Sequence, residues 1–153
     1  MISELYTAIA TALKTIPESE AEGAPALVKH IDLWNQNVEF IEEETPWPRP
    51  AVFIEFGEFV WDPYTGPAGG LTAKPYVTLH VVTDWAGSTA DGEATQAAAV
   101  AAMDLSEKIS EVLYGLAGTT FRNLKLVSSQ PNHNHEEVVE SIERYSVTVE
   151  RAL

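Results

Sequence analysis

Two apolar runs in the first half of the chain alternate in the way that β-strands do. The first covers residues 50–61 and the second residues 76–85, and both are rich in β-branched and aromatic side chains. The segment between them, 62–70, contains prolines and glycines, which interrupt a ladder of strand hydrogen bonds. The pattern predicts a hairpin of two long strands. We expect the connection over 62–75 to be mobile, because it has few partners for its backbone.

The first run changes phase at Gly57. Apolar side chains fall on even-numbered positions before the glycine and on odd-numbered positions at Phe59 and Trp61 after it. One extra residue in a strand produces such a change, because successive side chains point to opposite faces of a sheet. We therefore expect a bulge at or beside Gly57.

The second run has one apolar and one polar side. Its odd-numbered residues from Val77 to Trp85 are mostly apolar, whereas Tyr76, Thr78, His80 and Asp84 occupy even-numbered positions. This alternation predicts a strand with one buried face and one polar face.

Two helices are expected from apolar residues at three- and four-residue steps. The first covers residues 3–15 and ends before Pro17, and a polar, acidic connection follows it. The second begins at Ala94 and ends near Gly115 or Gly118. Its first half, 94–102, is rich in alanine, and we expect that half to pack closely on the sheet or on another helix.

Further strands complete the predicted fold. A short strand is expected over 27–34 and an extended, edge-like segment over 38–44. Residues 124–130 and 145–150 alternate and predict a second hairpin, with its turn at 131–136. Antiparallel strands with one helix before them and one between them favour a single α+β domain over residues 1–153. We expect a mostly antiparallel sheet of four to five strands, with both helices packed on one face.

Composition excludes several classes of function. The 153 residues contain no cysteine, which removes disulfides, thiolate metal sites and cysteine nucleophiles. Acidic residues number 23 and basic residues 9, for a net charge of −14. Direct binding to nucleic acid needs clustered Lys and Arg, so we do not expect it. The chain lacks an apolar run of the roughly 20 residues that a bilayer span needs, and its N-terminus lacks the basic start of a signal peptide. We expect a cytoplasmic protein with no membrane contact.

Few residues suggest catalysis or metal binding. His133 and His135 stand two apart near acidic residues, but a polar hairpin tip explains them better than a metal site, since further ligands are not evident. His80 is a lone strand histidine, which is typical of a solvated or hydrogen-bonded side chain rather than a catalytic base. The run Glu42 to Glu44 is typical of a solvated surface. We therefore expect neither an enzyme nor a bound cofactor or metal.

Aromatic residues at strand ends are the candidates for a partner interface. The chain has four tryptophans, which is many for its length. Packing in the core would explain them, but exposed aromatic side chains also anchor protein interfaces. The candidates are Trp34, Trp47, Trp61 and Tyr64.

The order of these elements, with the stretches 28–34, 46–56 and 145–150, resembles the tail-terminator (tail-completion) proteins of long-tailed phages and prophages. The likeness runs over most of the chain and rests on pattern, without an invariant motif. It implies a small α+β subunit that forms a ring, usually of six copies, which caps the tail tube and meets the head-completion protein. It also implies assembly in the cytoplasm and a final place in the virion tail, and it supplies no catalytic residues.

The acidic composition suits a second class of protein. An immunity protein, nuclease inhibitor or DNA mimic presents carboxylates to a basic partner. Such a protein would act as a monomer, whereas the tail-terminator resemblance implies a homo-oligomer.

Overall fold

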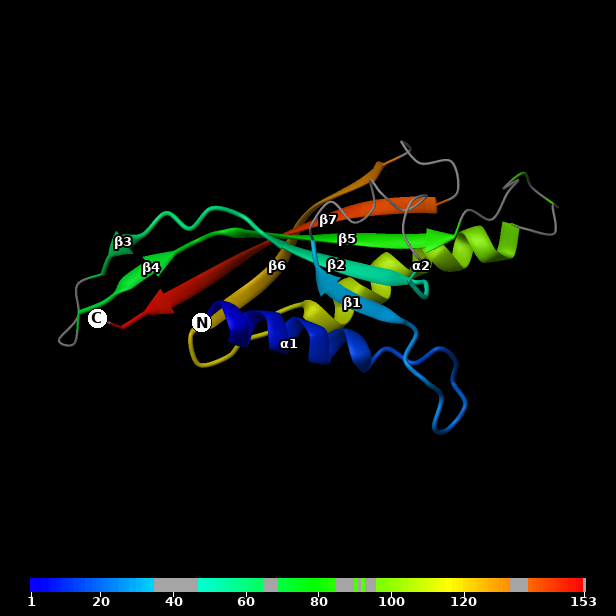
Figure 1. Ribbon diagram of the computed structural model, residues 1–153, viewed down its shortest axis with the longest axis horizontal. Coiled ribbons are helices and arrows are strands. Elements are labelled where there is room, and N and C mark those ends of the chain that lie inside the picture. The colour runs from blue at the N-terminus through cyan, green and yellow to red at the C-terminus, as the bar shows by residue number, and fades with distance from the viewer. Residues whose placement is uncertain are drawn as a thin grey trace.

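Two helices and seven strands make up the described part of the chain (Figure 1). The computed structural model describes residues 1–34, 47–64, 69–84, 90, 92, 96–132 and 138–152. The expected edge segment at 38–44 lies outside these residues. The architecture is α+β, and seven strands replace the four to five expected.

The helices are α1 (Ile2–Lys14) and α2 (Gln96–Leu113). Helix α1 ends where Thr15 closes the last turn, donating its hydroxyl to the carbonyl of Ala12 at 2.6 Å, two residues before Pro17. After α2, Gly115 adopts a φ of +72° and donates its N–H to the carbonyl of Leu124. A glycine suits this left-handed position because it has no Cβ. No helix in the described ranges is long and apolar enough to cross a membrane.

The strands form one mixed sheet. In chain order they are β1 (His30–Leu33), β2 (Ala51–Phe56), β3 (Asp62–Pro63), β4 (Leu71–Ala73), β5 (Tyr76–Asp84), β6 (Phe121–Asn132) and β7 (Val138–Arg151). Their order across the sheet is β1-β2-β5-β7-β4-β3, and β6 pairs with β7. Only the β1–β2 pair, among the described strands, is parallel. Strand β7 is therefore central: β5 and then β4 follow one of its edges, and β6 follows the other.

The first hairpin is interrupted at Gly57, as the phase change predicts. Phe56 pairs with Val77, and pairing resumes where Asp62 faces Thr72. The first strand thus takes six steps (56 to 62) while its partner takes five (77 to 72), which is one extra residue. The offset of one residue agrees with the expected bulge, but the ladder opens over residues 58–61 instead of at a single position beside Gly57.

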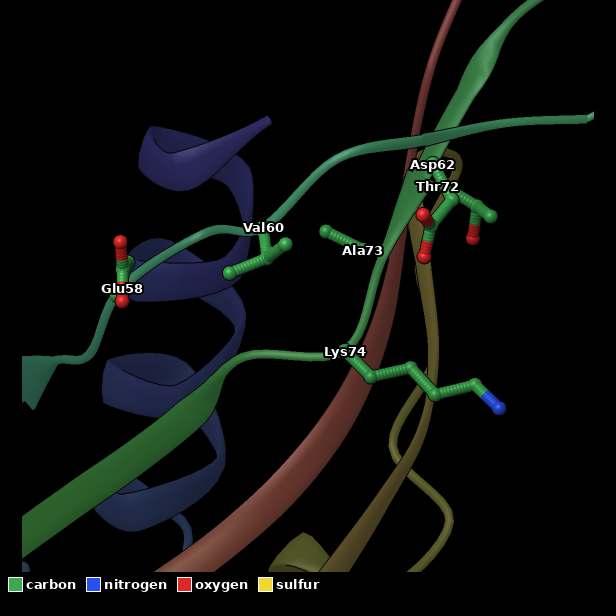
Figure 2. A pocket seen from close by; sticks show the side chains of 6 residues that line it. All are labelled: Glu58, Val60, Asp62, Thr72, Ala73 and Lys74. Carbon is green, nitrogen blue, oxygen red and sulfur yellow. The ribbon is translucent and has the colours of Figure 1, made fainter.

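This opening creates a hollow of about 260 Å³ at the edge of the sheet, lined by residues of both strands (Figure 2). Figure 2 shows the Lys74 side chain extending away from Glu58. The expectation of a plain loop over 62–75 was wrong at its two ends. Strands β3 and β4 pair there, and β4 also pairs with β7.

The main apolar core contains residues of both helices and one side of the sheet. Its helical members include Leu5, Ile9, Leu13, Leu105, Ile109 and Leu113. Its sheet members include alternate residues of three strands: Val52 and Ile54 of β2, Val77, Leu79 and Val81 of β5, and Tyr145, Val147 and Val149 of β7. Ala73 of β4 and Phe121 and Leu124 of β6 complete them. We call this side of the sheet the core face and the other side the second face.

Part of the alanine-rich half of α2 is exposed, and the side chains of Ala98 and Ala99 lie outside the described ones. Ala97 and Ala101 are exposed, and so are the larger Val100 and Met103. Among the α2 residues whose burial is described, the first buried one is Leu105. Small side chains are compatible with a close contact but do not create one, so the expectation of tight packing at Ala101 was wrong for the isolated chain.

Candidate functional site

The second face of the sheet is partly buried, contrary to the prediction from alternation in β5. Thr78 and His80, expected on the polar face of the strand, are buried. A second apolar cluster covers this region and consists of Ala51, Phe53, Val82 and Val138, with Trp34 and Trp47 packed against it. Both sides of β5 are therefore inside the protein, which is why its burial extends from Val77 to Thr83 without a break.

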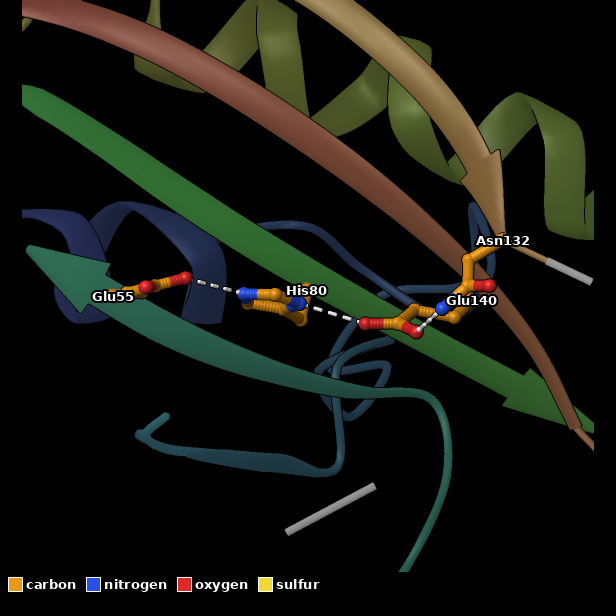
Figure 3. Close-up of polar contacts among 4 residues, drawn as sticks. All are labelled: Glu55, His80, Asn132 and Glu140. Atoms are coloured by element: carbon orange, nitrogen blue, oxygen red, sulfur yellow. Dashed lines mark hydrogen bonds and ion pairs between the residues drawn. The ribbon is translucent and has the colours of Figure 1, made fainter. Parts of the chain in front are cut away.

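His80 lies between two carboxylates at the centre of this face (Figure 3). Its Nδ1 is 2.6 Å from Oε1 of Glu140 on β7, and its Nε2 is 2.8 Å from Oε2 of Glu55 on β2. The other oxygen of Glu140 accepts a hydrogen bond of 2.6 Å from the side-chain amide of Asn132 on β6. These four residues, which we call the histidine clamp, join four neighbouring strands in one chain of polar contacts.

The clamp favours a protonated imidazole. Burial lowers the pKa of His80, but the hydrogen bonds and charges of Glu140 and Glu55 outweigh it, so the pKa lies above its ordinary value. An imidazolium has two N–H donors, and each of them has a carboxylate acceptor here. The clamp therefore pairs a buried cation with one buried and one half-exposed carboxylate.

Aromatic rings enclose the clamp. The Trp34 ring stacks on the His80 ring with centroids 3.8 Å apart and an interplanar angle of 6°. Phe53 meets Trp34 and Trp47 edge to face, with centroid distances of 6.3 Å and 4.8 Å. His30 stacks on Trp47 from β1. A cation sandwiched against an indole ring is stabilised by the electrons of the ring face, so Trp34 also favours the charged form of His80.

The segment before β2 is fixed to the same region by an ion pair. Nε of Arg49 lies 2.6 Å from Oδ1 of Asp84 at the end of β5. This contact holds the chain that carries Trp47 beside the sheet, which helps to keep the indole on Phe53.

The clamp is better suited to fixing strands than to catalysis. Both ring nitrogens of His80 are engaged by carboxylates, so neither is free to exchange a proton with a substrate. Among the described residues, no group of three His, Cys, Asp or Glu is arranged to hold a metal ion. His133, His135 and the run Glu42 to Glu44 lie outside those residues.

The four predicted interface residues fall in two places. Trp34 and Trp47 come together on Phe53 and are partly buried. Trp61 lies elsewhere, stacked on Phe59 and packed against the main core. Tyr64 is 42% exposed, and its ring leaves no room for a Cβ on Gly70. Their role as interface residues stays a prediction.

Sequence reasoning missed Glu55, Glu140 and Asn132. The expectation that His80 is hydrogen-bonded rather than a base agrees with the geometry, but its solvated alternative was wrong. What the sequence does not contain is the pairing of the strands. Phe53 of β2 pairs with His80 of β5, which places Glu55 two residues further along β2. On the other edge of β5, Val82 pairs with Glu140 of β7. Only the strand order brings these carboxylates beside the histidine.

A second buried carboxylate lies on the core face. Glu143 accepts hydrogen bonds from the hydroxyls of Ser129 and Ser141. The neighbouring Tyr145 hydroxyl is buried and has no hydrogen-bond partner among the described residues. Burial and then the charge of Glu143 raise the pKa of Tyr145, so this hydroxyl stays neutral.

Comparison with solved structures gives a likeness over nearly the whole chain. No family model matches the chain, and no curated protein matches it. A solved structure described as "Virion of native gene transfer agent (GTA) particle" contains a chain with a TM-score of 0.55 and 15% sequence identity. The match covers 95% of this chain and 94% of that chain. At this identity the likeness shows a shared fold over nearly the whole length.

Proposed function

We propose that this protein is a structural subunit of a phage or phage-like particle. The observation that carries the proposal is the nearly complete overlap, in both directions, with a chain of a gene transfer agent virion. A fold shared by chance with a larger protein would leave part of that protein unmatched. The residue pattern, which resembles tail-terminator proteins, supports the same class independently.

Within this class we propose a tail terminator or head-tail completion subunit. Such a subunit would assemble in the cytoplasm into a ring of six copies and would end in the virion tail. Its partners would be further copies of itself, the tail-tube protein and the head-completion protein. The net charge of −14 suits a conduit for DNA, because an acidic lumen repels the polyanion instead of binding it.

The role is proposed to be non-enzymatic and without a cofactor. The one buried histidine described here is enclosed by carboxylates and an indole. Its contacts hold β2, β5, β6 and β7 together, which suits a rigid building block.

Assembly tests the proposal. Identical acidic subunits repel at long range, so a ring forms only where short-range contacts exceed that repulsion. Raising salt from about 20 mM to about 300 mM shortens the Debye length from roughly 20 Å to about 6 Å. Light scattering after size-exclusion chromatography should then show a shift to a closed oligomer of fixed size, and electron microscopy should show that oligomer on the ends of tail tubes.

The acidic inhibitor is the second candidate, favoured by the net charge. It predicts a monomer at every salt concentration and a tight complex with a basic enzyme that salt weakens. A monomer that also fails to bind tail tubes, while inhibiting a nuclease, would replace the proposed function with this one.

A further inference from the structure

Basic residues are concentrated on one part of this acidic protein. Lys74, Arg122, Lys125 and Arg144 are four of its nine basic residues. All four are exposed. They lie around Ser146 and Thr148, which are second-face residues in the C-terminal half of β7. Strand β6 contributes two of them and contains no acidic residue along its whole length. We call these four side chains the basic patch.

The register places the patch on the second face. Arg122 faces Thr148 and Lys125 faces Ser146 across the β6–β7 ladder. Arg144 lies on the same side of β7, with its guanidinium 5.6 Å from the centre of the Tyr76 ring. Lys74 reaches this side from the turn between β4 and β5. Arg122 forms an ion pair with Glu150. Counted with that carboxylate, the patch holds four positive charges and one negative charge.

A hollow lies within the patch. It has a volume of about 300 Å³ and is lined by Lys74, Asn123, Lys125, Ser146, Val147 and Thr148. Two lysines, one asparagine and two residues with hydroxyl groups therefore line a space large enough for a side chain. These groups supply hydrogen-bond donors and positive charge, which is the chemistry that receives a carboxylate.

The chain carries a complementary acidic surface elsewhere. A hollow of about 320 Å³ between the connection after α1 and the second half of α2 is lined by Glu18, Glu20 and Glu111, with Lys108 beside them. Glu22 is exposed on the same connection. In Figure 1 this connection lies at the opposite end of the molecule from β3 and β4. One subunit thus presents opposite charges on two separate surfaces.

We propose that the basic patch binds the acidic connection of a second copy of this chain. Two different surfaces on each subunit make the contact heterologous, and repeated heterologous contacts close into a ring when the rotation permits. The contact explains how subunits of net charge −14 associate, because close opposite charges act at short range while the overall repulsion is screened by salt. This inference rests on the proposed ring and names the surface that forms it.

A protein partner suits the patch better than nucleic acid. Four cations, one of them already paired with Glu150, are few against 23 acidic residues in the same chain. Non-specific binding to DNA depends on releasing many counterions from its phosphates. A few carboxylates from another subunit need only local complementarity.

The test uses two full-length double variants, each of which reverses the charge of one of the two surfaces. Lys74→Glu with Lys125→Glu makes the patch acidic, and Glu20→Lys with Glu22→Lys makes the connection basic. Each variant alone should self-associate at least about tenfold more weakly than the wild type, because like charges then face each other. An equimolar mixture should recover association, since each reversed surface meets an oppositely charged one. Asp104→Lys is the control: it changes the net charge at an exposed position of α2 that lines neither hollow, and it should assemble as the wild type does.

Sedimentation equilibrium separates the outcomes. Loss of association in each variant and recovery in the mixture support the inference. A wild type and a lysine variant that assemble equally well overturn it and leave the proposed ring intact. Charge-swap behaviour without a closed ring, or without capping of tail tubes, supports the contact but overturns the proposed function. A wild type that never self-associates, even when tail tubes are present, overturns both. Wild-type binding to duplex DNA that the lysine variant loses overturns the inference.

Discussion

Replacing His80 with leucine tests the histidine clamp most directly. His80→Leu places an apolar side chain of similar size against Trp34 and removes the cation between Glu140 and Glu55. The Glu140 side chain is only 3% exposed, so its carboxylate loses a charged partner inside the protein. Removing one partner of a buried ion pair costs about 3 to 5 kcal/mol of folding free energy.

The exposure of the two carboxylates determines the expected loss of folding free energy and supplies a control variant. The Glu55 side chain is 46% exposed, and exposed ion pairs contribute about 0 to 1 kcal/mol. Glu55→Gln should therefore cost less than about 1 kcal/mol, while His80→Leu should cost about 3 kcal/mol or more. For a chain of this length, that corresponds to a fall in Tm of roughly 6 to 20 °C. Urea denaturation of the three proteins at pH 6 measures the difference.

The pH dependence supplies an independent check. Because the pKa of His80 is raised in the folded protein, the folded state holds this proton more tightly than the unfolded chain does. The stabilisation is complete below the unfolded value of about 6.5 and is lost as pH rises through the raised pKa. The gap between wild type and His80→Leu should therefore narrow from pH 6 to pH 9. A gap below about 1 kcal/mol at pH 6, or one that widens with pH, would refute a charged clamp.

Three further substitutions test other parts of the fold. Gly57→Ala should cost about 1 to 3 kcal/mol in urea denaturation, because its Cβ would lie 3.1 Å from the carbonyl oxygen of Tyr76; an unchanged midpoint would contradict the close approach. Tyr145→Phe should leave the Tm unchanged or raise it, since it removes a buried hydroxyl without a partner among the described residues; a large loss would reveal a partner. Leu105→Ala should cost about 2 to 5 kcal/mol, whereas Met103→Ala, on the same helix but 69% exposed, should stay within about 0.5 kcal/mol, and equal costs would rule out the observed orientation of α2.

The period of the apolar residues predicted the elements whose burial follows their own local sequence. Both helices formed close to their expected bounds, because each has an apolar stripe at helical spacing. The interruption at Gly57 was predictable because a change of parity has few other causes. These signals are local, and neither depends on which strands become neighbours.

The candidate site was not predictable, because it depends on which strands become neighbours. His80 and Glu140 are 60 residues apart and meet only because β7 lies beside β5. A buried carboxylate looks the same in sequence as a solvated one, since what distinguishes them is a partner from another strand. Glu140 and Glu143 also made the first half of β7 look too polar for a strand, so the strand was expected only over 145–150. It begins at Val138.

The same strand connects the clamp to the basic patch. Residues of β7 alternate between the two faces, so the contact of Glu140 with His80 requires the even-numbered residues to lie on the second face. That alternation places Arg144 there as well. The register of β6 is less strictly defined, because its pairing with β7 contains two register shifts. The hydrogen bond between Asn132 and Glu140 fixes that register at one end of β6. A slip of one residue would move the cations of β6 to the core face, where burial of a charge is costly. The clamp thus fixes the register on which the proposed subunit contact depends, although none of its four residues belongs to the patch.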